Sequence, residues 1–227
     1  MKDYRLYWER CWQEEGIAEL YRYLDMYYGI KTEEIAVFQE HGVKKVCDAA
    51  CGFGAYSLAY SSNGFDVHSF DISDTAVEIT KNGLLRYGID AKNVKAASIL
   101  DTGYEDGFFD GVIAHAVIDH LTAEDAEKAL EELIRITKIN GLVLITFDVA
   151  EENDFAEEHM TLEDGTMEYI KGSRKGMVFR PHDWDMINEY VSGYNVIYRA
   201  EKMNRERVVI LQKGVVQGAD SELVNRA

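Results

Sequence analysis

Asp48, Gly52, Gly54 and Asp71 have the residue types and the spacing of a site for a small organic ligand. Asp48 stands where a short apolar stretch, 46–49, should end as a buried strand. The two glycines that follow free the backbone for a tight turn and for close approach of a ligand. Asp71 ends a second apolar stretch about 20 residues further on, the distance at which an acid commonly binds the hydroxyls of a ribose.

The same residues indicate which ligand this site would take. A dinucleotide fingerprint requires Gly-x-Gly-x-x-Gly/Ala, whereas the third position here is Ser57. A carboxylate at Asp48 would repel a pyrophosphate, but it suits a ligand that carries positive charge. S-adenosylmethionine has an ammonium and a sulfonium group and no phosphate, so we expect it as the cofactor. A nicotinamide-dependent oxidoreductase is the less favoured alternative.

A strand, a turn and a helix are needed to position these residues. The helix is expected from about Ala55 to Ser62, and the whole unit is the first crossover of an open α/β sheet, which binds cofactors at the carboxyl ends of its strands. Similar patterns predict strands at 67–70, 94–98, 109–117, 142–147, 194–200 and 207–212, the last two forming an antiparallel hairpin. A long helix should begin at Thr122 and end at Gly141.

The ordered set of motifs resembles the class I S-adenosylmethionine-dependent methyltransferases. Asp48-x-x-Cys51-Gly52-x-Gly54 and Asp71 are followed by Phe109-Asp110-Gly111-Val112-Ile113 and by the run 133–145, in the order and spacing of that family. The resemblance covers roughly residues 44–147. It implies an α/β, Rossmann-like, seven-stranded, mostly parallel sheet with an antiparallel last strand and helices on both faces. It also implies methyl transfer to a small-molecule acceptor by direct displacement.

The resemblance further implies which residues meet the cofactor. Ser98 stands where the family usually has an acid that binds the adenine amine, and Asp101, three residues on, could take that part instead. Tyr4, Tyr7 and Trp8 could belong to a lid over the cofactor or could simply pack on the sheet. The expected cofactor contacts are Asp48, Ala49, Cys51, Gly52, Gly54, Asp71, Ile72, Ser98, Ile99, His115, Tyr7 and Trp8.

Direct displacement needs alignment more than it needs a nucleophilic side chain. Asp119 and His120 are nevertheless candidate catalytic residues, because a His beside an Asp can act as a base near neutral pH. His120 could equally be a structural residue that hydrogen-bonds where a helix begins. A non-catalytic S-adenosylmethionine-binding protein therefore remains an alternative.

One domain with four parts is expected. Residues 1–42 would form an N-terminal helical lid, with two short helices broken at Gly16, and 43–147 the cofactor-binding core. Residues 148–180 would form a substrate-side insertion with a hairpin, and 181–213 a helix and β-hairpin that complete the sheet; a polar tail follows. Candidate substrate contacts in and beside the insertion are His159, Tyr169, Arg180 and His182.

The composition of the chain narrows the classes of partner that it is expected to bind. The net charge is −17, from 24 basic and 41 acidic residues, which argues against nucleic acid and anionic membranes. The three cysteines, Cys11, Cys47 and Cys51, form neither a disulfide pattern nor a metal motif, so we expect no metal. No apolar run reaches the about 20 residues of a membrane span and no signal peptide is evident. We expect a cytoplasmic protein, monomer or homodimer, with a small-molecule substrate.

Overall fold

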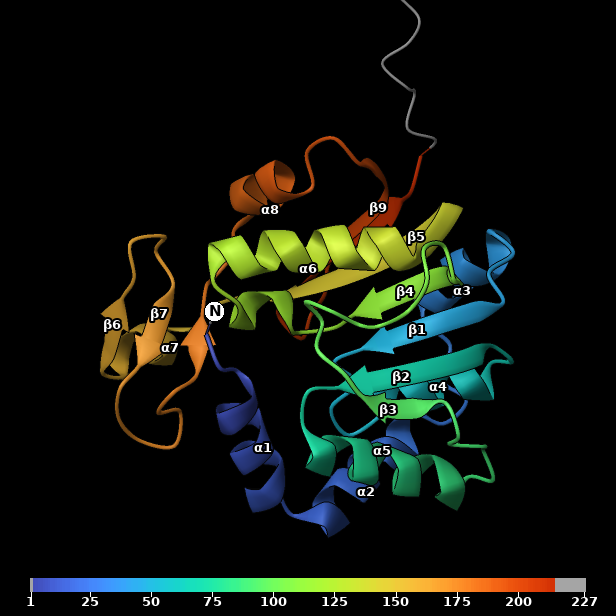
Figure 1. Cartoon of the computed structure of the whole chain (residues 1–227), viewed down its shortest axis with the longest axis horizontal. Helices are drawn as coiled ribbons and strands as arrows, with labels where there is room; N and C mark the ends of the chain where they lie inside the picture. Colours follow the sequence, from blue (N-terminus) through green and yellow to red (C-terminus); the bar gives the residue numbers. More distant parts are fainter. Residues whose placement is uncertain (1, 215–227) are drawn as a thin grey trace, which may run out of the picture.

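A computed structural model describes residues 2–214, so the predicted polar tail lies almost wholly outside the described residues. Its centre is a seven-stranded sheet of order β3-β2-β1-β4-β5-β10-β9 (Figure 1). The strands are β1 (Lys45–Ala49), β2 (Asp66–Asp71), β3 (Val94–Ala96), β4 (Phe109–Ala114), β5 (Thr137–Asp148), β9 (Asn195–Glu201) and β10 (Glu206–Gln212). The first five run parallel, and β10 is antiparallel to both of its neighbours. The predicted fold class is confirmed.

Helices cover both faces of this sheet. α6 (Ala123–Ile136) and α8 (Trp184–Tyr190) pack on one face through buried Leu133 and Ile187. On the other face lie α3 (Glu33–Glu40) and α4 (Ala55–Ser62), with Phe38 and Tyr60 buried between helices and sheet. α5 (Asp74–Arg86) packs beside α4. Figure 1 shows α6 crossing in front of the strands, with α3 and α4 behind them.

The N-terminal helices and the insertion flank the carboxyl edge of the sheet. α1 (Arg5–Glu14) and α2 (Ile17–Tyr27) are separated at Gly16, as predicted. After β5 come α7 (Glu152–Ala156) and a small antiparallel sheet of β6 (His159–Thr161), β7 (Met167–Tyr169) and β8 (Val178–Phe179). The predicted hairpin is the β7–β8 pair. Among residues 2–214, no helix is both long and apolar enough to cross a membrane.

Several predicted boundaries are wrong, and the largest error concerns Gly141. α6 ends at Ile136 and β5 begins at once, because the Thr137 hydroxyl donates to the Leu133 carbonyl, 2.7 Å away, and closes the helix. Gly141 lies within β5, where a Cβ would sit 2.7 Å from the Asp110 carbonyl oxygen. Glycine is therefore required by a close approach of two strands and not by a helix end.

The other differences are shorter. β3 ends at Ala96 and β4 at Ala114, so the residues after them are free to form the loops that border the site. α8 begins after Asp183, whose side chain accepts the Met186 N–H at 2.9 Å, and not at the preceding Pro181 segment. Thr122 is the N-cap of α6, as predicted, and Thr32 and Ser73 cap α3 and α5; each side chain accepts a backbone N–H of the first turn.

Candidate cofactor and active site

A cavity of about 320 Å³ opens at the carboxyl ends of β1, β2 and β4. Its floor is the glycine turn and the strand ends, and α1 crosses above it. The short 3₁₀ turn after β4, η1 (Ile118–His120), closes one side. The lining consists of Tyr4, Trp8, Trp12, Tyr27, Asp48, Ala50, Cys51, Gly52, Phe53, Ala55, Tyr56, Phe70, Asp71, Ile72, Ala97, Ser98, Ile99, Leu100, His115, Ala116, Val117, His120 and Leu121.

The glycine turn needs glycine at two positions for different reasons. Gly52 has φ +53°, and a Cβ there would lie 2.9 Å from the indole of Trp12. Gly54 has φ +85° as the N-cap of α4, and a Cβ there would lie 2.9 Å from the methyl group of Thr80. The turn is thus packed between α1 and α5, and its backbone stays open on the cavity side.

Asp48 is held by the residue that replaces the third glycine of a dinucleotide fingerprint. The Ser57 hydroxyl donates to Asp48 Oδ2 at 2.5 Å and lies 2.7 Å from Ser69 Oγ. Burial raises the pKa of Asp48 to about 6, although the Ser57 hydrogen bond and nearby His115 oppose the shift. A bound ammonium group would favour the ionised carboxylate. This arrangement suits a cationic ligand group beside Asp48.

Asp71 joins the glycine turn to the start of α5. Its Oδ2 accepts the Gly52 N–H and its Oδ1 accepts the Ser73 N–H, both at 2.9 Å. Burial raises the pKa of Asp71 in spite of these two bonds. Each carboxylate oxygen keeps a second acceptor position, so the side chain can also receive hydroxyl groups from the cavity.

Ser98 and Ile99 line the cavity beyond β3, together with Ile72 after β2. The Leu100 N–H donates to Ser98 Oγ at 3.1 Å, which leaves the Ser98 hydroxyl proton for another acceptor. Asp101 is exposed and does not line the cavity. The alternative that Asp101 takes the adenine-binding position is therefore wrong.

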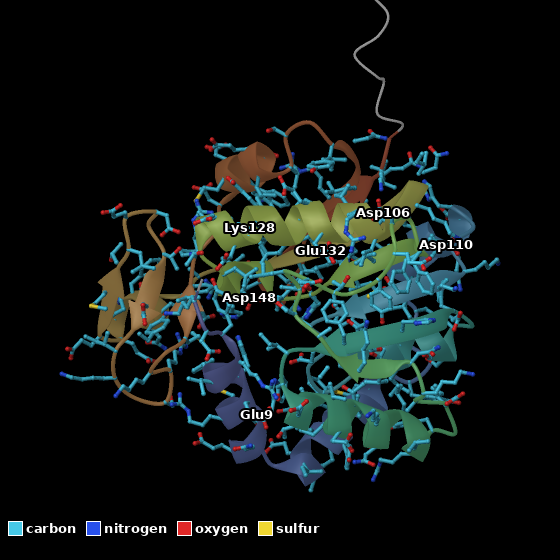
Figure 2. The ribbon with its side chains drawn as sticks, viewed as in Figure 1. Glu9, Asp106, Asp110, Lys128, Glu132 and Asp148 are labelled. Carbon is cyan, nitrogen blue, oxygen red and sulfur yellow. The ribbon has the colours of Figure 1, made fainter. Side chains whose placement is uncertain are left out.

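α1 is fastened over the cavity at two points. Near its start, the Tyr4 hydroxyl donates to Asp125 Oδ2 at 2.7 Å and accepts the Thr122 N–H, at the beginning of α6. In its middle, Glu9 accepts the hydroxyls of Ser73 and Thr75 at 2.6 and 2.5 Å, at the beginning of α5. The bond from Ser73 is the main cause that lowers the pKa of Glu9 to about 2. Figure 2 labels Glu9 where α1 faces α5.

α1 turns three aromatic side chains toward the cavity, but not all those predicted. Tyr4, Trp8 and Trp12 line it, whereas Tyr7 packs instead against the apolar cluster of β7 and β8. The helical period explains the difference, because Tyr4, Trp8 and Trp12 recur every four residues along one face, whereas Tyr7 directly precedes Trp8 and points about 100° away from it. Tyr7 as a cofactor contact is therefore corrected to a contact with the insertion.

The two candidate catalytic residues lie in different environments. His120 lines the cavity, and its Nδ1 is 3.0 Å from the Val178 carbonyl oxygen, so Nδ1 carries the proton and Nε2 has the lone pair. Burial lowers the pKa of His120, which favours this neutral form. Its ring meets Trp8 edge to face, with centroids 5.0 Å apart.

Asp119 is fully buried behind the cavity and does not line it. Its Oδ2 accepts the Asp148 N–H at 2.6 Å, and its Oδ1 lies 3.8 Å from Nδ1 of buried His182. Figure 2 labels Asp148 at the end of β5, near the insertion. The prediction that Asp119 acts at the reacting atoms is corrected: it fastens η1 to the end of β5.

His115 has a partner that the sequence did not reveal. Its Nε2 is 2.6 Å from Glu206 Oε1, and its ring lies 4.3 Å from that of Tyr56. Burial alone would raise the pKa of Glu206, but the contact with His115 helps to lower it. Glu206 is on β10, brought there only because β10 inserts next to β5. Three further residues that line the cavity were not predicted from the sequence: Tyr27, Phe53 and Tyr56. Tyr27 lies on α2, and the many aromatic residues of that segment were the available signal.

Other predicted contacts lie outside the cavity. Ala49 and Gly54 shape the turn without lining it. Among the insertion candidates, the Tyr169 hydroxyl donates to the Asp154 carbonyl, and Arg180 donates to the Asp164 carbonyl. His159 and His182 also do not reach the cavity. Within residues 2–214, no three His, Cys, Asp or Glu side chains gather as they would around a metal ion.

Parts of this chain match known proteins in sequence. Residues 47–145 match a family model described as a methyltransferase domain. A tRNA (carboxymethyluridine(34)-5-O)-methyltransferase of Arabidopsis thaliana is 34% identical over 127 residues, which is 55% of this chain and 29% of that protein. A glycine/sarcosine N-methyltransferase of Aphanothece halophytica is 28% identical over 155 residues, 64% of this chain and 58% of that protein. The chain spans less than half the length of the first curated relatives it matches.

Solved structures share the fold across most of the chain. A S-adenosylmethionine-dependent methyltransferase from Methanosarcina mazei has a TM-score of 0.67 at 16% identity, covering 82% of this chain and 99% of that one. Magnesium protoporphyrin IX methyltransferase from Synechocystis, with S-adenosylhomocysteine bound, has a TM-score of 0.60 at 17% identity, covering 80% of each chain.

The fold is that of the Rossmann-like methyltransferases, and residues 47–145 match a methyltransferase domain. Residues 47–145 are a methyltransferase domain of the class I S-adenosylmethionine-dependent family, so the resemblance stated from the sequence is confirmed. The cofactor of this family is S-adenosylmethionine, as the residues around the glycine turn predicted.

Proposed function

We propose that this chain is an enzyme that transfers a methyl group from S-adenosylmethionine to a small-molecule acceptor. The observation that carries the proposal is that Asp48, the Gly52 turn and Asp71 open onto one cavity under α1. Three groups are thereby aligned along the carboxyl edge of the sheet: a carboxylate for an ammonium group, an open glycine backbone, and a carboxylate for ribose hydroxyls.

Each part of the cavity has a proposed contact. Asp48 binds the ammonium group, Asp71 binds the ribose hydroxyls, and Ser98 with Ile99 binds the adenine edge. Cys51, Ile72 and Trp8 pack against the cofactor. His115, held by Glu206, borders the methionine part beside Asp48.

Alignment is the main catalytic contribution of the chain. When bound, S-adenosylmethionine supplies an electrophilic methyl group, and its C–S bond breaks with the electron pair on sulfur as the acceptor attacks in line. α1 and η1 hold the acceptor and exclude water, and such orientation contributes roughly 7–11 kcal/mol to lowering a barrier. His120, neutral with a lone pair on Nε2, takes a proton from an acceptor that arrives protonated.

A small molecule is favoured over nucleic acid as the acceptor. The cavity is covered by α1, and the chain carries a net charge of −17, which repels a polyanion. The tRNA methyltransferase among the relatives is the reason to test the alternative directly. A nicotinamide-dependent oxidoreductase is disfavoured because Ser57 replaces the third glycine of a dinucleotide fingerprint and because the Asp48 carboxylate would repel a pyrophosphate.

Calorimetry and turnover test the proposal in two steps. Titration of the full chain with S-adenosylmethionine, S-adenosylhomocysteine and NAD should give binding of the first two and none of NAD. Release of S-adenosylhomocysteine should then be measured with amines, phenols, thiols and unmodified tRNA. Binding of NAD alone would overturn the cofactor assignment. Cofactor binding with no turnover on any acceptor class would favour the non-catalytic alternative. Turnover on tRNA would show that the acceptor is a nucleic acid and not a small molecule.

A further inference from the structure

The ionisable groups that line the cavity are carboxylates, imidazoles, phenols and one thiol. They include two carboxylates, Asp48 and Asp71, two imidazoles, His115 and His120, and tyrosines. Among the described residues, the lining contains neither Lys nor Arg. Buried Glu206 adds a third carboxylate directly behind His115. The protein therefore offers an acceptor negative charge and no fixed positive charge.

Basic side chains on the elements around the cavity are committed elsewhere. On α1, Arg5 pairs with Asp74 and Arg10 donates to the carbonyls of Ser173 and Lys175. In the insertion, Arg174 Nη1 lies 2.6 Å from Asp154 Oδ1. These contacts turn the cations away from the cavity. An anionic acceptor would find no ion-pair partner among them without breaking an existing contact.

The cofactor does not reverse this balance. S-adenosylmethionine carries two positive groups and one carboxylate, hence a single net positive charge, whereas Asp48 and Asp71 line the cavity and Glu206 lies behind His115. Burial raises the pKa of Asp48 to about 6, yet a neighbouring ammonium keeps it ionised. The loaded cavity thus stays neutral or negative.

Aromatic rings form much of the remaining wall. Trp8, Trp12, Tyr27, Phe53 and Tyr56 all line the cavity. Trp12 and Phe53 lie with ring centroids 6.3 Å apart, and Tyr27 and Tyr56 with centroids 6.1 Å apart. Such walls hold planar ligands by stacking, and their faces attract cations.

We propose, resting on the proposed function, that the methyl acceptor is an amine that carries a planar aromatic ring, neutral or positively charged, and that anionic acceptors are excluded. In the reaction, a protonated amine gives one proton to His120 Nε2. The freed nitrogen lone pair forms the new N–C bond while the C–S bond breaks onto sulfur. The products are a methylated ammonium and a neutral thioether, and the proton on His120 leaves to solvent.

The test compares two probes that differ only in charge. Tryptamine and indole-3-propionate have the same ring and chain length, with an ammonium in one and a carboxylate in the other. Each is titrated by calorimetry into the full chain saturated with S-adenosylhomocysteine. Tryptamine should bind at least about tenfold more tightly, since ring-face attraction and the carboxylates act together.

A matched pair of variants places one extra cation inside or outside the cavity. Val117→Lys adds it to the lining, whereas Leu85→Lys adds it on the exposed face of α5. In Val117→Lys the affinity ratio of the two probes should fall by about tenfold, and in Leu85→Lys it should be unchanged. S-adenosylhomocysteine affinity is measured first in each variant, so that a misfolded protein is recognised.

The outcomes separate this inference from the proposed function. If S-adenosylhomocysteine fails to bind the unaltered chain, the proposed function itself is wrong. If it binds, but indole-3-propionate equals or exceeds tryptamine, or neither probe binds, only the aromatic-amine inference is overturned. The comparison in the unaltered chain decides the question even where Val117→Lys does not fold.

Discussion

Asp71 illustrates how one side chain in this site has two tasks. Both of its oxygens already accept backbone N–H groups, from Gly52 and Ser73, and the same carboxylate faces the cavity. Removing it therefore leaves two N–H groups without acceptors as well as removing the proposed ribose contact. A loss of affinity has to be read together with a loss of stability.

Asp71→Ala should weaken S-adenosylhomocysteine binding and lower the melting temperature. Charge-assisted hydrogen bonds contribute about 1.5–3 kcal/mol, so the affinity should fall on the order of 10- to 150-fold. Asp101→Ala is the control, because Asp101 is exposed and lies outside the cavity. Calorimetry and thermal unfolding measure both effects; an unchanged affinity in Asp71→Ala would reject the ribose assignment.

His120 gives a prediction about pH. Burial lowers its pKa from the ordinary value, and only the neutral imidazole accepts a proton. Activity on an amine acceptor should therefore fall only as the pH drops through this lowered pKa, which lies below the ordinary value of about 6.5. His120→Gln should lose this acidic limb as well as kcat, while keeping its affinity for S-adenosylhomocysteine. A pH profile of kcat that is identical in both proteins would remove His120 from the mechanism.

At the scale of elements, α1 forms the roof of the site, and the first turns of two other helices hold it in place. α1 supplies Tyr4 to the first turn of α6 and Glu9 to the first turn of α5. Carboxylates are stabilised at helix N-termini. α1 is thereby placed across the cavity by the beginnings of two helices that belong to the core, and its position can be tested by removing one attachment.

Glu9→Ala should loosen α1 without unfolding the core. In hydrogen exchange, the unaltered chain should gain protection in residues 3–12 and in the glycine turn when S-adenosylhomocysteine binds, and the variant should gain it mainly in the turn. Glu14→Ala, exposed at the end of the same helix, is the control. Protection confined to the turn in the unaltered chain would mean that α1 is packing material and not a lid.

Local sequence patterns predicted most helices and strands, but they could not predict contacts between segments that are distant in the sequence. The order of strands and helices followed from apolar stretches, caps and glycines. Gly141 was misplaced because its need arises from the Asp110 carbonyl on a neighbouring strand. Glu206 was missed because the insertion of β10 beside β5 is what brings it to His115. Asp119 and His120 are adjacent in sequence, yet one faces the core and the other the cavity, which only the 3₁₀ turn decides.

At the scale of the whole molecule, a buried polar cluster joins the core to the segment that follows the insertion. His182 is 1% exposed, and its ring stands between Asp119 and Arg180. Burial, assisted by Arg180, lowers the pKa of His182 to about 4. In the unfolded chain its pKa is near 6.5, so the unfolded state binds more protons between these values.

The folded state should consequently lose stability as the pH falls from about 6.5 to about 4, by up to about 3 kcal/mol from His182. His182→Gln should reduce this slope, and His41→Gln, at an exposed helix end, should not. Urea unfolding at several pH values measures the slopes. Equal slopes in all three proteins would show that His182 does not titrate on unfolding.

Two of the three tryptophans, Trp8 and Trp12, line the cavity, and the third, Trp184, lies on α8 beneath Arg199. The protein consequently carries its own optical reporter of occupancy. A ligand that fills the cavity changes the surroundings of two indoles at once, while Trp184 gives a constant background signal. Titration with S-adenosylhomocysteine should alter the intrinsic fluorescence, and Trp12→Phe should remove part of the change. Trp184→Phe should lower the baseline and leave the amplitude intact, so that a screen for acceptors needs no label.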